Sequence, residues 1–249
     1  MFNRRTYKKL AKSQLKGRRF VPAIATLITI AILALISGPE TYSKNFSEGK
    51  NPYLQNVDFI EEDFPNGMNF FWEKNFSAYS DSSDLIFSII MVCILGILNL
   101  ALCHLYNEYF KDAGKIPLSR WLQGFSYWFK GALSMLWYSL WIFLWSLLFF
   151  IPGLVKAFSY SQMFFIIAEN PKISVAKAMR LSKVMTKGFK ADLFVMYLSF
   201  ILWDFLSVCT GGILVLWVHP YKKLSFLNAY KDLKIHAIRA GLLSPEDFR

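Results

Sequence analysis

Cysteine, histidine and acidic residues are scarce in this sequence. Its 249 residues include three cysteines, three histidines and 17 acids, against 28 lysines and arginines. Because Cys93, Cys103 and Cys209 show no CxxC spacing, the sequence predicts neither a zinc site nor a structural disulfide. It also contains no HExxH motif, no Walker loop and no Ser/His/Asp arrangement. We therefore expect no enzyme and no bound metal or cofactor.

Long apolar runs, by contrast, are abundant. The chain is 55% hydrophobic and 18% aromatic, with a mean hydropathy of +0.33. Several runs approach or reach the roughly 18 residues typical of a membrane-crossing helix. The net charge of +11 lies beside these runs and not in a separate soluble domain. The expected partners are therefore anionic lipids of the inner leaflet rather than nucleic acid.

We predict an all-α fold in one membrane domain, residues 1–249, with six transmembrane helices arranged as three hairpins. The predicted spans are residues 20–37, 85–106, 132–151, 154–168, 193–208 and 213–230. The first follows a basic segment, as in a signal peptide, but it exceeds the apolar run of about 7–15 residues that such a peptide has. The sixth contains Pro220, and the sequence leaves open whether its helix continues through that residue.

A basic amphipathic helix is predicted before each hairpin, at residues 3–16, 117–130 and 171–187. In the third, Asn170 is the expected cap. One face of this helix is basic, with Lys177, Arg180, Lys183 and Lys187. The other face is apolar, with Val175, Ala178, Leu181 and Met185. This pattern is typical of a helix lying on a membrane surface, so the four basic residues are predicted contacts of anionic lipids.

The order of these elements indicates an internal repeat of three units. Each unit consists of an amphipathic helix, a Lys-Gly pair, a span, an outer turn and a second span. The Lys-Gly pairs are at residues 16–17, 130–131 and 187–188. Because glycine ends a helix at little cost, each pair is expected to mark the turn from the membrane surface into the first span.

Lysine and arginine fall almost entirely on one side of the predicted topology. Segments 1–19, 107–130, 169–192 and 222–249 hold 24 of them, whereas the opposite side holds three. By the positive-inside rule, both termini are expected to be cytoplasmic. The loop 38–83, rich in acids and aromatics, is then extracytoplasmic. We interpret it as an aromatic cap at the interface in preference to a lid or a partner-binding cap.

Ionisable groups inside predicted spans are candidate functional residues, because a charge within a bilayer is costly. Lys156 and Asp204 are predicted at similar depths below the outer turns, so they can pair between the fourth and fifth spans. Such a pair can serve a function or be purely structural. The short or interrupted spans at 154–168 and 213–221 occupy corresponding positions of two repeats, and in transporters such positions mark ligand sites. The alternative is that the lysines beside Pro220 simply extend to the cytoplasmic surface. The predicted intramembrane polar site consists of Lys156, Tyr160, Asp204, His219 and Tyr221.

Several motifs together resemble a known family. They include Leu15-Lys-Gly17, Ile151-Pro-Gly153, Ala168-Glu-Asn-Pro171, Leu198-Ser-Phe200 and Leu216-Trp-Val-His-Pro-Tyr221. The chain resembles uncharacterised bacterial six-pass membrane proteins, the domain of unknown function nine-seven-five, which are distantly similar to the membrane part of some glycerophosphodiester phosphodiesterases. The resemblance implies a multi-pass protein of the bacterial cytoplasmic membrane, and it transfers no catalytic residue.

Two functions remain open at this point. The first is a membrane protein that binds or moves a small or lipid-like ligand within the helix bundle. The alternative is a non-catalytic scaffold or accessory subunit that engages anionic lipids or a membrane-protein partner. The first function predicts a polar cavity between the helices, and the second predicts none.

Overall fold

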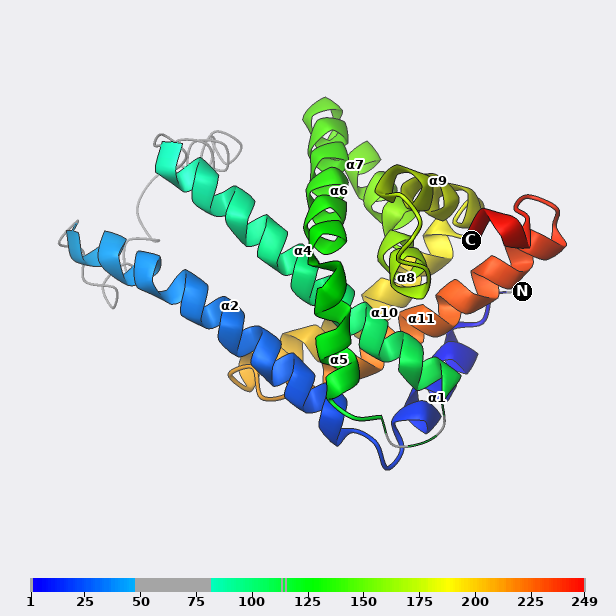
Figure 1. Ribbon diagram of the computed structural model, residues 1–249, viewed down its shortest axis with the longest axis horizontal. Coiled ribbons are helices and arrows are strands. Elements are labelled where there is room, and N and C mark those ends of the chain that lie inside the picture. The colour runs from blue at the N-terminus through cyan, green and yellow to red at the C-terminus, as the bar shows by residue number, and fades with distance from the viewer. Residues whose placement is uncertain (1, 48–81, 113, 115, 249) are drawn as a thin grey trace. The chain divides into compact units, whose positions relative to one another are not determined.

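The computed structural model describes residues 2–47, 82–112, 114 and 116–248, and every regular element in them is helical (Figure 1). Most of the acidic loop predicted at 38–83 lies outside these residues. In chain order the elements are α1 (Arg4–Leu15), α2 (Phe20–Ser47), α4 (Ser82–Lys111), α5 (Ser119–Gln123), the 3₁₀ helix η3 (Gly124–Tyr127), α6 (Trp128–Leu148), α7 (Phe150–Tyr160), α8 (Met163–Glu169), α9 (Val175–Met185), α10 (Lys190–Cys209), α11 (Val215–Arg239) and the 3₁₀ helix η4 (Pro245–Phe248).

The chain forms two compact units. The smaller unit, residues 29–91, contains the later part of α2 and the first turns of α4. Its described side chains are strongly apolar and largely exposed, as expected for helices in contact with lipid: Leu35, Leu85, Ile86, Ile89 and Ile90. The larger unit, residues 1–28 and 92–249, contains both cavities discussed below.

Four helical stretches are long and apolar enough to cross a membrane, namely Leu85–Lys111, Ser119–Leu148, Ile151–Glu169 and Lys190–Cys209. A fifth is added if Arg4–Leu15 and Phe20–Ile36, which meet at 98°, count as one bent span. α11 is not among them, because lysines interrupt its apolar sequence. The described residues therefore support several membrane-spanning helices but do not confirm six spans or their arrangement as hairpins.

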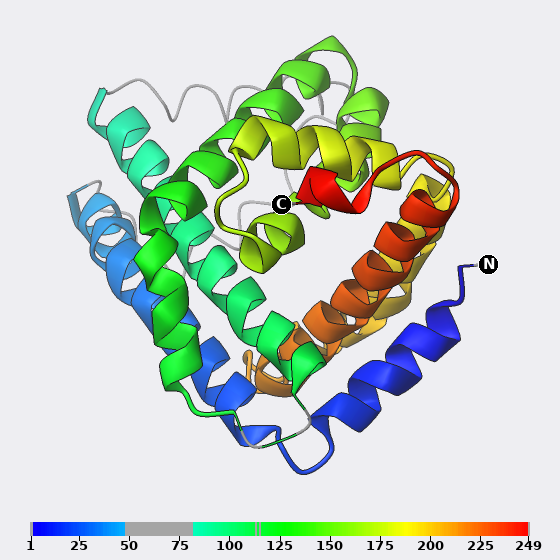
Figure 2. The same cartoon turned by 45° about the vertical axis from the view of Figure 1, so that its right-hand side comes forward.

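α1 begins at a capped end and packs against α11. The Asn3 side chain accepts hydrogen bonds from the backbone N–H groups of Arg5 and Thr6. The face predicted to be apolar is buried at three positions, Tyr7, Ala11 and Leu15, while Leu10 is exposed. Figure 2 shows α1 running beside α11. Gly17 then adopts a φ of 75°, which allows the sharp turn into α2.

α9 differs from the surface helix that its sequence suggests. Its cap is Ser174, whose side chain accepts a hydrogen bond from the Lys177 N–H, whereas the Asn170 side chain donates to the Phe248 carbonyl. The predicted apolar face is fully covered by protein, chiefly by α8: Val175, Ala178, Leu181 and Met185 are all buried. The neighbouring helices therefore cover the apolar face, while Arg180 and Lys183 on the opposite face remain exposed.

The Lys-Gly pair at residues 130–131 does not form the expected turn. α6 begins at Trp128 and continues through Gly131, so this glycine lies inside a helix. A Cβ atom on Gly131 would lie 2.8 Å from the Cα of Ile97 in α4. A Cβ atom on Gly124 would similarly lie 2.6 Å from the Cα of Ala101 in α4. These glycines allow α4 to approach α6 and η3 closely, as small residues do between membrane helices.

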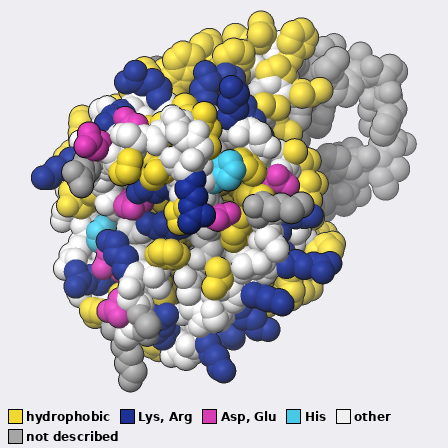
Figure 3. Space-filling view, turned by 90° about the vertical axis from the view of Figure 1, so that its right-hand side faces the viewer, with side chains coloured by type: hydrophobic (Ala, Val, Ile, Leu, Met, Phe, Trp, Pro, Cys, Tyr) yellow, Lys and Arg dark blue, Asp and Glu magenta, His cyan; other side chains and the backbone are white. Residues whose placement is uncertain are grey.

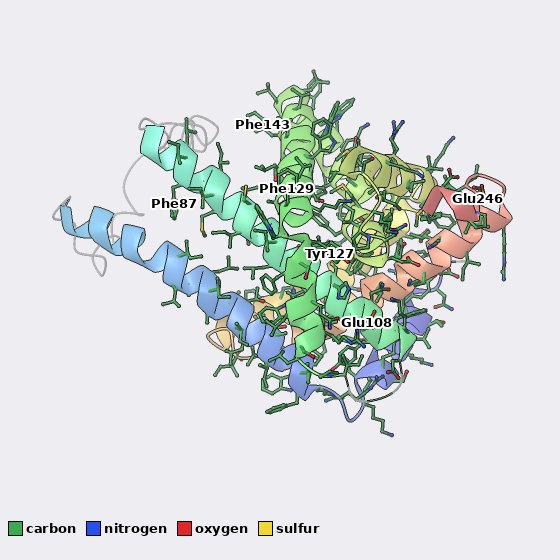
Figure 4. All side chains as sticks on the ribbon, in the orientation of Figure 1. Phe87, Glu108, Tyr127, Phe129, Phe143 and Glu246 are labelled. Atoms are coloured by element: carbon green, nitrogen blue, oxygen red, sulfur yellow. The ribbon has the colours of Figure 1, made fainter. Side chains whose placement is uncertain are left out.

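α11 runs without a break through Pro220, which answers the question that the sequence left open. A core cluster holds this part of the helix against α1 and α10: it comprises Tyr7, Met196, Phe200 and Ala229, with Phe2, Tyr221 and Phe226 packed around it. On α6, by contrast, large side chains such as Phe129 and Phe143 remain exposed, and Figure 4 shows them on that helix.

Candidate functional site

A cavity of about 320 Å³ lies between the α7–α8 junction, α10 and α11, and we call it the polar cavity. Its volume lies at the lower end of the roughly 300–1,000 Å³ typical of small-molecule sites. Seven lining residues are polar or charged: Ser161, Gln162, Asp204, Ser207, His219, Lys222 and Lys223. The other five form an apolar wall: Phe165, Tyr197, Val215, Val218 and Phe226.

Asp204 and Lys222 form an ion pair in this cavity. The Lys222 Nζ donates to the Asp204 Oδ2 at 2.5 Å, and it also lies 4.3 Å from the centroid of the Tyr197 ring. Lys156 does not take this place, because its Nζ lies over the Trp145 ring at 4.1 Å. The partner that the structure gives Asp204 is therefore a lysine of the adjacent helix α11, not the lysine of α7 that the sequence suggested.

The neighbouring basic side chains are oriented by single polar partners. The Lys223 Nζ donates to the Asn99 Oδ1 at 2.6 Å, which links α11 to α4. The His219 Nδ1 lies 3.4 Å from the Thr26 Oγ1, and the His219 ring is 6.4 Å from that of Tyr106. Lys223 therefore has a neutral partner and keeps its positive charge uncompensated among the described residues.

Gln162 occupies the break between α7 and α8 and is fully buried. Its Nε2 donates to the Ser161 Oγ at 2.9 Å, whereas its Oε1 accepts no hydrogen bond from the described part of the chain. A buried carbonyl oxygen without a partner costs roughly 1–3 kcal/mol, so it needs an explanation. A ligand that donates a hydrogen bond in the polar cavity would provide one.

α9 fixes the backbone at this break. The Ser182 and Thr186 hydroxyls both donate to the Ser159 carbonyl, at 2.7 and 3.2 Å, and the Gln162 N–H donates to the Ser182 Oγ at 3.3 Å. The Lys130 Nζ donates to the Ile173 carbonyl at 3.0 Å, which holds the start of α9 against α6. These contacts satisfy backbone groups that the interrupted helix leaves without partners.

The structure brings together only part of the predicted site. Asp204 and His219 line the polar cavity, whereas Lys156 and Tyr160 do not. Tyr221 lines a second cavity, on another side of α11. The residues that sequence reasoning left out of the site are Gln162, Lys222 and Lys223. For the two lysines, a consecutive pair inside an apolar helix was a usable signal.

The basic residues of α9 remain predicted lipid contacts. Arg180, Lys183 and Lys187 are exposed and Lys177 is half-buried. Figure 3 shows many Lys and Arg side chains on the face that lies at the right of Figure 1, mixed with fewer acids. Within the described residues, no group of three or more His, Cys, Asp or Glu side chains is placed to hold a metal ion.

An acidic residue at the end of α8 attaches this helix to α11. The Glu169 carboxylate accepts hydrogen bonds from the Tyr230 hydroxyl at 2.5 Å and from the Lys234 Nζ at 2.9 Å, and it lies 3.1 Å from the Lys231 Nζ. Burial lowers the pKa of Lys231, and Glu169 opposes that shift. We interpret this cluster as structural, because one carboxylate satisfies all three donors.

In the part of the chain that the structure describes, every regular element is helical, several helices are able to cross a membrane, and a partly open cavity with polar groups lies between the α7–α8 junction, α10 and α11. A family model described as "Protein of unknown function (DUF975)" matches residues 148–237. This match supports the resemblance to that family found in the sequence, and the matched segment contains every residue lining the polar cavity. No curated protein and no solved structure matches the chain.

Proposed function

We propose that this protein is a non-enzymatic membrane protein that binds a small anionic amphiphile in the polar cavity. The observation that carries the proposal is the combination, in one cavity, of the Lys223 ammonium group, the unpartnered Gln162 oxygen and an apolar wall. A site with few placed polar groups and an apolar lining is typical of small-molecule binding.

The polar groups suggest how the ligand is held. An anionic group placed beside Lys222 and Lys223 would receive charge-assisted hydrogen bonds from both, and it would compete with Asp204 for Lys222. The Gln162 Oε1 is buried in the structure, so it would accept a hydrogen bond from a ligand hydroxyl once its side chain turns toward the cavity. The apolar part would pack against Phe165, Tyr197 and neighbouring side chains.

Six spans, cytoplasmic termini and residence in the bacterial cytoplasmic membrane form part of the same proposal. The basic segments on one side of the predicted topology support this orientation. A sixth span requires α11 to enter the membrane with Lys222 and Lys223. Their partners, Asp204 and Asn99, reduce the cost of placing these side chains there.

Ligand binding can be tested with three probes on the full chain in detergent: inorganic phosphate, hexanoate and hexyl phosphate. We expect hexyl phosphate to raise the melting temperature most, because only it combines a phosphate with an apolar chain. Lys223→Gln should weaken its apparent affinity by roughly tenfold, the loss of about one charge-assisted hydrogen bond. The matched control, Lys187→Gln at an exposed position just after α9, should leave the affinity unchanged.

Two results would contradict ligand binding. If none of the probes stabilises the wild-type chain, or if Lys223→Gln responds as the wild type does, ligand binding in this cavity is wrong. A stoichiometric protein that co-purifies with the unresponsive chain would then favour the scaffold function. The exposed apolar side chains of α6 and α10 offer a surface for such a partner.

A further inference from the structure

A second cavity, of about 310 Å³, lies beside the end of α1, and we call it the α1 cavity. Its lining comes from α1, the turn into α2, and the two helices α10 and α11: Lys12, Leu15, Arg19, Trp203, Leu214, Leu216, Trp217, Val218, Pro220 and Tyr221. Two of these residues are cationic, none is acidic, and most of the others are large and apolar. The cavity thus combines positive charge with an apolar wall.

Both cations lack an acidic partner among the described residues, and the local structure explains why they are available. Lys12 lies in the last turn of α1, where a positive charge is favoured by the helix dipole. Arg19 follows Arg18, whose Nη1 donates to the carbonyls of Asp112 and Gly114 at 2.7 and 2.9 Å. Arg18 therefore anchors the turn, and Arg19 is left to line the cavity.

The position of α1 is fixed by polar contacts with α11. The Tyr7 hydroxyl donates to the Asp232 carboxylate at 2.5 Å. The Gln14 and Asn228 side chains exchange hydrogen bonds of 3.0 and 3.3 Å. These contacts and the buried Leu15 hold the backbone of α1 beside the wall formed by α11, and the exposed Lys12 side chain lines the cavity from there. The fold therefore fixes the helix that supplies Lys12.

The apolar wall is partly open. Trp203 of α10 and Trp217 of α11 each keep 48% of their surface exposed, and Leu214, just before α11, is half-buried. Tryptophan is enriched where membrane proteins meet lipid headgroups, because its ring is apolar and its N–H group is polar. An occupant must therefore carry an anion at one end and an apolar chain at the other.

We propose that the α1 cavity binds one anionic phospholipid, with its phosphate between Lys12 and Arg19 and an acyl chain along Trp217 and Leu214. A free small anion would leave the apolar wall uncovered, and a neutral lipid would leave both cations unpaired. Charge and shape together thus select a lipid of the anionic class. This cavity shares only Val218 with the polar cavity, and its two cations are not part of that site, so the proposal does not depend on the function proposed there.

The test uses the delipidated full chain in a neutral detergent, titrated with phosphatidylglycerol and followed by native mass spectrometry. We expect saturable binding of one lipid per chain, and no comparable binding of phosphatidylcholine. The double variant Lys12→Gln/Arg19→Gln should weaken binding by about tenfold or more, as expected for the loss of two charge-assisted hydrogen bonds. The matched variant Lys183→Gln/Lys187→Gln removes the same charge from α9 and should change binding by less than about twofold.

Three further results separate the possible causes. Trp217→Ala should weaken lipid binding even if the double variant fails to fold. Equal losses from the α1 and α9 variants would mean diffuse charge attraction and would overturn the proposal. If inorganic phosphate displaces the lipid fully at similar concentration, the site is selective for a small anion, and the proposal is likewise wrong.

Discussion

α1 and α9 carry the same kind of sequence but hold different positions in the fold. Both are short, basic and amphipathic, and both are followed by a glycine with positive φ, 75° at Gly17 and 88° at Gly188. Both bury their apolar face against protein. α1, however, places Lys12 beside a cavity with an apolar wall, whereas α9 supports the break between α7 and α8 through Ser182 and Thr186.

The comparison of α1 and α9 shows which property of a helix an amphipathic sequence predicts and which it does not. The pattern correctly identifies the face that leaves water, because burying apolar side chains is favourable in protein and in lipid alike. It does not distinguish between the two environments. For α9, protein covers the face; for α1, protein covers Tyr7, Ala11 and Leu15, and a partly open cavity adjoins them.

The largest expected effect tests whether protein covers the apolar face of α9. Leu181→Ala should lower the free energy of unfolding by about 2–5 kcal/mol, because it leaves a void in a packed interior. Leu15→Ala on α1 should cost a similar amount. The measurement is an unfolding titration of each variant in mixed micelles.

Leu10→Ala is the matched control for both, since this leucine is 46% exposed on α1 and its loss should cost little. If Leu181→Ala proves as mild as Leu10→Ala, the apolar face of α9 contacts lipid or solvent after all. Protein would then not be what covers the apolar face of α9.

The remaining Lys-Gly pair, at residues 130–131, sharpens the comparison, because its glycine has another role. Gly131→Ala should lower the free energy of unfolding by about 1–3 kcal/mol, since the added methyl group meets the α4 backbone at Ile97. Gly188→Ala has open space around it but a φ of 88°, so it should cost only about 1–2 kcal/mol of backbone strain.

A second substitution separates the two mechanisms. Replacing Gly188 with Asn, which tolerates positive φ, should recover part of the loss, whereas Gly131→Asn should be worse than Gly131→Ala. The same unfolding titration measures both. Recovery of stability at residue 131 would mean that this glycine forms a turn, as its sequence first suggested.

Much of the helical fold was predictable from the sequence, but its contacts were less so. Apolar runs indicated membrane-crossing helices, and the described residues contain four or five of them. The turn expected at Gly131 was wrong because a glycine can either end a helix or allow a neighbouring backbone to approach closely. Only the position of α4 decides between these roles, and the sequence around Gly131 does not reveal that position.

The candidate site was predictable to the same limited degree. Asp204 and His219 were identified because polar groups in apolar helices stand out. The pairing of Asp204 depends on how α10 and α11 are rotated about their axes, and this rotation places Lys222 beside it. Gln162 gave no signal, because its importance comes from a break between α7 and α8 that α9, a separate element, stabilises.

The smallest expected effect concerns the polar contact that attaches α1 to α11, the counterpart of the hydroxyl contacts that attach α9. Tyr7 donates to Asp232, which is exposed, so solvent weakens the interaction. A double-mutant cycle with Tyr7→Phe and Asp232→Asn should give a coupling energy of about 1 kcal/mol. Thr186→Val on α9, which removes a fully buried hydroxyl, should cost at least as much. The same unfolding titration measures the coupling energy. A value near zero would mean that apolar packing alone attaches α1 to α11, whereas α9 is also attached by buried hydroxyl groups.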